Sequence, residues 1–89
     1  ARAVGMLGPR DIAIDAEGLL YVTDTDRNRI VVLNPQGEEV RTIGGDAPNG
    51  GSEPGQLRQP WGVAIGPDGN LYVADTWNHR VQVFNPEGE

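Results

Sequence analysis

Residues 60–89 read PWGVAIGPDGNLYVADTWNHRVQVFNPEGE and align without a gap on residues 9–38, which read PRDIAIDAEGLLYVTDTDRNRIVVLNPQGE. The offset is 60 − 9 = 51 residues, and 15 of the 30 aligned positions carry the same amino acid. Turn formers, apolar residues and charges recur in the same register, as in the pair Tyr21 and Tyr72. The chain therefore contains one structural unit twice, and a period of this length is typical of repeat architectures.

The composition limits the class of protein. Of the 89 residues 37% are apolar, and none is Cys, which excludes a disulfide scaffold and any Cys-ligated metal site. No apolar run approaches the ~20 residues of a membrane helix, and residues 1–10 lack the apolar core of a signal peptide, so we expect no membrane partner. Thirteen acidic and seven basic residues give a net charge of −6. This charge disfavours a nucleic-acid partner, because polyanion binders carry concentrated positive charge.

Each copy has the pattern of a strand meander. Short runs rich in β-branched and aromatic residues predict strands at residues 11–15, 19–24, 29–34 and 38–44, and in the second copy at 62–66, 70–75 and 80–85. The breaks between them hold Gly, Asn, Asp and Pro, which supply the positive or fixed φ of tight turns. No segment shows a sustained helical period, so the sequence predicts an all-β chain.

The strands of the first copy are apolar at both even and odd positions. Even positions carry Ile12, Ile14, Leu20, Val22, Ile30 and Val32, and odd positions carry Ala13, Tyr21, Val31 and Leu33. A lone sheet in water keeps one face polar, so we expect each sheet to lie between similar sheets. A tandem four-stranded meander with two apolar faces is typical of a β-propeller blade. We therefore predict a β-propeller built from four-stranded antiparallel blades, with two blades per chain.

The two copies are out of phase with the chain ends. The first blade, residues 9–44, has four expected strands, whereas residues 60–89 supply the first three strands of a second blade. Residues 1–5 contain RAVG, which is similar to RTIG at the end of the first copy's fourth strand. We expect residues 1–5 to complete a blade of a neighbouring chain by strand exchange, and residues 45–59 to form a connecting loop. We therefore expect an engineered or excised, self-assembling segment.

The second copy resembles an NHL repeat, a family named for its Asn-His-Leu signature. Here the signature reads Asn78-His79-Arg80, with the third position changed, and the first copy matches less well, with Arg-Asn-Arg at residues 27–29. The resemblance implies a closed ring of six blades. Because two blades cannot close a ring and fewer than ~3 repeats rarely form a stable core, we predict self-association. Three chains would give a six-bladed C3 homotrimer, and the alternative is a tetramer of eight blades.

The meander geometry divides the loops into two sets. The first set, at residues 15–18, 34–37, 67–69 and 85–88, holds short repeated turns for which we expect no role beyond chain reversal. The second set emerges on the opposite side of the blades, varies between the copies, and is where binding is expected on a rigid scaffold. We call its members the candidate binding face: Arg10, Asp26, Arg27, Trp61, Trp77 and His79.

Each aromatic member of this face has a simpler interpretation as well. Trp61 and Trp77 could anchor a protein or peptide ligand, or they could cover the ends of the blades. His79 could be a metal ligand or a general base. We favour a structural role for His79, with its side chain hydrogen-bonded to a carboxylate or carbonyl group.

Two charged pairs have the spacing of hairpin contacts. Asp24 and Arg29, and likewise Asp75 and Arg80, flank one expected turn, so we predict structural ion pairs that fix each hairpin. Residues 24–28 begin like a calcium loop. However, Arg29 stands where that loop needs Gly, and Pro35 stands in place of its last carboxylate ligand. We therefore predict no catalytic residue, no metal site and no cofactor.

These observations favour a non-enzymatic propeller module that self-assembles and acts as a scaffold or protein-interaction surface. The alternative is a fragment of a larger NHL propeller with ligand-binding or metal-dependent lyase or hydrolase activity. A single His and no Cys make that alternative poor in metal ligands. RNA recognition, which the resemblance implies for some NHL domains, is disfavoured by the absence of Lys and by the acidic surplus.

Overall fold

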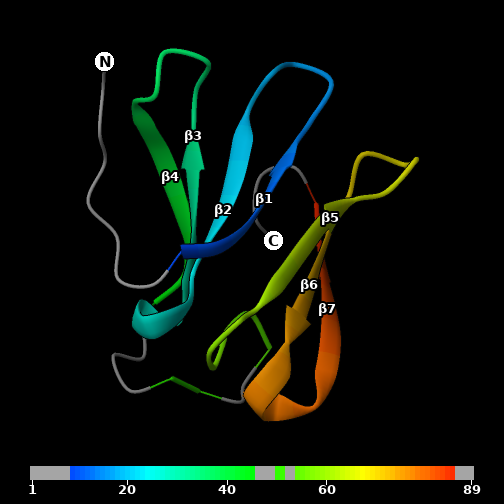
Figure 1. The fold of residues 1–89 in the computed structure, drawn as a ribbon. Coiled ribbons are helices and arrows are strands. Elements are labelled where there is room, and N and C mark those ends of the chain that lie inside the picture. The colour runs from blue at the N-terminus through cyan, green and yellow to red at the C-terminus, as the bar shows by residue number, and fades with distance from the viewer. Residues whose placement is uncertain (1–8, 46–49, 52–53, 86–89) are drawn as a thin grey trace.

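The computed structural model describes residues 9–45, 50–51 and 54–85, and they form two antiparallel sheets (Figure 1). The first sheet has the order β1 (Pro9–Ile14), β2 (Leu20–Asp24), β3 (Arg29–Leu33) and β4 (Glu39–Gly44). The second has the order β5 (Gly62–Ile65), β6 (Leu71–Asp75) and β7 (Arg80–Phe84). The predicted all-β fold is confirmed, whereas the expected exchange of residues 1–5 falls outside the described residues. Within the described part, no helix has the length and apolar character needed to cross a membrane.

A single 3-10 turn joins the second and third strands of each sheet. These turns are η1 (Thr25–Arg27) and η2 (Thr76–Asn78). Each ends at a residue with a left-handed backbone, Asn28 with φ 59° and His79 with φ 56°. Few residue types other than Gly adopt this conformation readily, and Asn and His are among those enriched in it. The two copies therefore close the same hairpin with different residues.

The two sheets pack face to face around a shared core. The first sheet contributes Tyr21, Ile30, Val32 and Ile43, the second contributes Val63, Leu71, Val73 and Phe84, and the connection adds Leu57. Two hydrogen bonds join the sheets beside this core. The backbone N–H of Val63 donates to Asp11 Oδ2 at 3.1 Å, and Thr25 Oγ1 donates to the carbonyl of Pro60 at 2.7 Å. The first strands of the two sheets, β1 and β5, lie side by side (Figure 1).

Position number alone does not assign a residue to a face of the first sheet. In the β2–β3 hairpin Val22 pairs with Val31 and Thr23 with Ile30, so even positions oppose odd positions. The even-numbered residues of β2 and β3 therefore do not share a face, and grouping Ile30 and Val32 with Leu20 and Val22 is wrong. The number of residues in the turn decides which positions of the two strands lie on the same face. Ile30 lies with Tyr21 on the shared face, and Val31 lies with Val22 on the other. Both faces of the sheet are nevertheless apolar.

Each sheet also has an apolar face on the side away from the shared core. We call these the first open face, formed by Ile12, Ile14, Leu20, Val22, Val31 and Leu33, and the second open face, formed by Ala64, Tyr72, Ala74, Val81 and Val83. On the first open face Ile12 and Ile14 are 51% and 62% exposed, whereas Val22, Val31 and Leu33 are buried. On the second, Val81 and Val83 are 64% and 52% exposed. Exposed apolar residues gathered on one surface are typical of an interaction site.

Candidate functional site

The candidate binding face lies along one end of both sheets. Figure 1 shows η1 and η2 at the same end, opposite the turns that join β1 to β2, β3 to β4 and β5 to β6. Asp26 and Arg27 belong to η1 and are exposed, and Trp77 belongs to η2 and is 60% exposed. The variable loops of the two blades therefore share one end of the molecule.

Arg10 and Trp61 are the members of this face that the structure brings into contact. The Arg10 guanidinium carbon lies 4.2 Å from the centroid of the Trp61 ring, a distance at which a cation is attracted to the ring face. The Trp61 backbone N–H donates to the carbonyl of Ala74, which fixes the start of the second sheet. Trp61 is still 48% exposed. Its ring and the guanidinium form an amphipathic surface open to solvent.

The remaining members have solvent-exposed side chains. Trp61 and Trp77 are 48% and 60% exposed, so about half or more of each side chain is open to solvent in this chain. His79 is exposed, and its side chain makes no hydrogen bond to any described residue; its backbone N–H donates to the carbonyl of Thr76. In this chain His79 acts through its backbone, as the left-handed residue that ends η2.

Asp75 is a buried anchor for the connection between the sheets. Its Oδ1 accepts the backbone N–H of Arg58 at 2.8 Å, and its Oδ2 accepts Arg80 Nε at 2.8 Å and Asn78 Nδ2 at 2.9 Å. Burial alone would raise the pKa of Asp75, but the hydrogen bonds from Arg58, Asn78, Arg80 and Gln82 outweigh burial and lower it. Asp75 is therefore a charged, fully hydrogen-bonded structural residue.

The equivalent pair in the first blade has the same geometry. Arg29 Nε donates to Asp24 Oδ2 at 2.7 Å, and the Asp24 side chain is fully buried. Nearby, Asn28 Oδ1 accepts the backbone N–H of Gln59 at 2.8 Å. The sequence analysis did not predict the roles of Asn28 and Asp11. Their side-chain oxygens accept hydrogen bonds from the backbone N–H groups of Gln59 and Val63, which are distant in the sequence.

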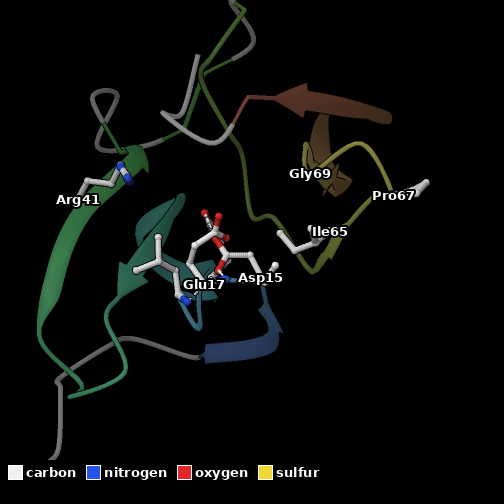
Figure 2. Close-up of a pocket in the computed structure, with 10 residues that line it drawn as sticks. Asp15, Glu17, Arg41, Ile65, Pro67 and Gly69 are labelled. Atoms are coloured by element: carbon white, nitrogen blue, oxygen red, sulfur yellow. Dashed lines mark hydrogen bonds between the residues drawn. The ribbon is translucent and has the colours of Figure 1, made fainter.

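At the opposite end of the molecule the two sheets line a partly open pocket of about 410 Å³, which we call the inter-sheet pocket (Figure 2). It is lined by Asp15, Ala16, Glu17, Leu19, Tyr21, Arg41, Ile65, Gly66, Pro67 and Gly69. These residues come from the β1–β2 turn and its flanking residues, from β4, and from the β5–β6 turn. Sequence analysis expected only chain reversal at these turns, since the space between them depends on how the sheets pack.

Tyr21 and Asp15 are joined in the wall of this pocket. The Tyr21 hydroxyl donates to Asp15 Oδ2 at 3.0 Å, while Asp15 Oδ1 accepts the backbone N–H groups of Glu17 and Leu19. Burial and the hydrogen bond to Asp15 raise the pKa of Tyr21 to about 12. The phenol is therefore a neutral donor at physiological pH and does not act as a base there.

No described residues form a metal-ligating group, since no three or more His, Cys, Asp or Glu side chains gather where they could hold an ion. The charged side chains instead form hairpin pairs, inter-sheet anchors and pocket walls. Two antiparallel sheets of equivalent sequence, stacked with their first strands side by side, define the chain as a pair of repeat blades.

Comparison with known proteins identifies the type of repeat. The model of the NHL repeat matches residues 6–33 and 57–84. The chain therefore belongs to the NHL repeat family, as its sequence predicted.

Several curated relatives are similar over most of the chain. NHL repeat-containing protein 2 of Gallus gallus is 37% identical over 94% of this chain and 12% of its own length. Peptidyl-glycine alpha-amidating monooxygenase A of Xenopus laevis is 37% identical over 89% of this chain and 9% of its own length. Protein wech of Drosophila melanogaster is 50% identical over 43% of the chain and 5% of its own length. The chain thus spans about a tenth or less of these relatives, one of which is named as an enzyme.

Proposed function

We propose that this chain is a non-enzymatic sector of an NHL β-propeller that associates with copies of itself and presents an interaction surface. The observation that carries the proposal is the relation between the open faces and the shared core. An apolar sheet face gains stability when a complementary face covers it. The chain itself contains the template for such a contact, because its two blades already pack in this way.

The repeat offset of 51 residues relates each open face to the buried face of the other sheet. Five residues of the first open face, Ile12, Ile14, Leu20, Val22 and Leu33, correspond to Val63, Ile65, Leu71, Val73 and Phe84 on the second sheet's shared face. Conversely, Tyr21, Ile30 and Val32 of the shared face correspond to Tyr72, Val81 and Val83 of the second open face. The first open face of one copy therefore fits the second open face of another with the apolar pairing used inside the chain.

Contacts of this kind join unlike surfaces and close into a ring when the rotation permits. Three chains supply the six blades that the family resemblance implies, and four would supply eight. In the trimer residues 1–5 of one chain would pair with β7 of the next, which completes its blade. The formal charge of three chains is 3 × −6 = −18, which favours solubility and also repels across the ring.

The interaction surface in this proposal is the candidate binding face. Exposed Trp and Arg side chains are the residue types that most often dominate protein–protein interfaces, and the Arg10–Trp61 contact places one of each together. The alternative is a fragment of a propeller with metal-dependent lyase or hydrolase activity. Metal analysis of the purified protein would detect that alternative as a stoichiometric bound ion.

Mass measurement in solution tests the assembly. Sedimentation equilibrium should return about three times the 9.6 kDa chain mass. The variants Ile14→Glu and Val81→Glu, one on each open face, should both reduce the mass to that of one chain, because a buried unpaired charge opposes docking. Trp77→Glu is the matched control, since it adds the same charge on the binding face. A folded wild-type monomer at micromolar concentration would contradict self-association.

A further inference from the structure

The inter-sheet pocket has the properties of a small-molecule site. It lies within one chain, between the two sheets, so it is independent of the proposed ring. Its volume of about 410 Å³ is in the range of pockets that hold small ligands. We propose that it binds a small zwitterion with an aliphatic body, that is, an amino carboxylate.

Arg41 supplies the positive side of the pocket. Among the described residues, its buried Nη1 has no hydrogen-bond partner and its guanidinium has no ion pair. Buried polar atoms without a partner are rare in proteins, and the guanidinium fork matches the two oxygens of a carboxylate. Arg41 also lines the pocket. Because Nη1 is closed to solvent, the guanidinium has to turn toward the cavity before a carboxylate there can accept from Nη1.

Glu17 supplies the negative side. Asp15 has both oxygens engaged, by the Tyr21 hydroxyl and by two backbone N–H groups. The Glu17 carboxylate is exposed and has no side-chain partner among the described residues. Figure 2 shows Arg41 extending from β4 on one side of the pocket, with Asp15 and Glu17 between it and the β5–β6 segment. An ammonium group would therefore meet a free carboxylate.

The charges of the pocket favour a ligand with both signs. With one guanidinium and two carboxylates in the lining, a simple anion is repelled by Asp15 and Glu17, and a simple cation leaves Arg41 without an acceptor. The side chains of Leu19, Ile65 and Pro67 add apolar lining, which suits a short methylene chain between the two charged groups.

Titration of the wild-type protein with ω-amino acids from glycine to ε-aminohexanoate, followed by NMR, tests the site. The expected result is that one chain length binds best and shifts the methyl signals of Leu19 and Ile65. Hexanoate and hexylamine, which carry one charge each, should bind about tenfold more weakly, as expected when one charge-assisted hydrogen bond is lost. This comparison needs no variant and so does not depend on refolding.

Two variants then assign the charges. Arg41→Gln and Glu17→Gln should each weaken binding of the best amino acid by about tenfold, while Arg58→Gln, at an exposed position of the connection outside the pocket lining, should leave it unchanged. Equal binding of hexanoate and its amino derivative, or no effect of Glu17→Gln, would overturn the zwitterion assignment. No methyl shift with any probe at millimolar concentration would overturn the site itself.

Discussion

Tyr21 and Tyr72 occupy equivalent positions in the two blades but lie in different surroundings. Tyr21 is 2% exposed in the shared core, whereas Tyr72 is half-buried on the second open face. Their hydroxyls also donate to different carboxylates, Asp15 for Tyr21 and Asp68 for Tyr72. The difference shows that a repeated residue acquires its energetic role from the neighbour that covers it.

The change of hydrogen-bond partner has a local cause. Gly66 stands in the second blade where the first has Asp15, and a Cβ added at Gly66 would lie 2.5 Å from the Tyr72 ring. An aspartate cannot take that place without moving the ring, so the hydroxyl bonds to Asp68 in the following turn. Equivalent hairpins of the two blades thus fix the tyrosine hydroxyl with carboxylates at different positions.

The largest expected effect comes from removing each ring. Tyr21→Ser should destabilise the chain by about 2–4 kcal/mol, because it leaves a cavity in the shared core. Tyr72→Ser should cost much less in an isolated chain and about as much as Tyr21→Ser once another blade covers the second open face. Thermal unfolding of both variants at low and high protein concentration distinguishes the two cases. Equal and small losses in both would contradict burial of Tyr21.

A smaller effect is expected for the two equivalent threonines. Thr25 Oγ1 is buried and donates across the sheets to Pro60, whereas the Thr76 hydroxyl donates to the carbonyl of Ala74 at the exposed edge. Thr25→Val should therefore cost about 1 kcal/mol through loss of one buried hydrogen bond, and Thr76→Val should be near neutral in a single chain. Denaturant titration measures both. A larger loss for Thr76→Val would show that position 76 contacts another copy.

The smallest effect is a difference in alkaline titration. The pKa of Tyr21 is raised to about 12 by burial and by Asp15, while the hydrogen bond to Asp68 raises that of Tyr72. Because the unfolded Tyr21 ionises near pH 10 and the folded one does not, its contribution to stability is complete below pH 10 and is lost as pH rises toward about 12. Ultraviolet titration of the Tyr72→Phe variant isolates Tyr21. A midpoint near pH 10 would contradict its burial.

Much of the fold follows from local patterns in the sequence. The strand runs, the Gly, Asn and Pro turns and the repeat predicted two antiparallel meanders. The contacts Asp24–Arg29 and Asp75–Arg80 also lie across hairpins of five-residue spacing. Such features depend on neighbours in the chain, so propensity and spacing are sufficient to indicate them.

The sequence by itself determined that this chain is a tandem pair of NHL blades with apolar strands. Only the tertiary structure decided which residues share a face, since the parity across η1 depends on the turn, and only sheet packing brought Arg41 to the same pocket as Glu17 and Ile65. The physical reason is that strands and turns are set by local backbone preferences, whereas faces and pockets depend on register and on contacts between segments distant in the chain.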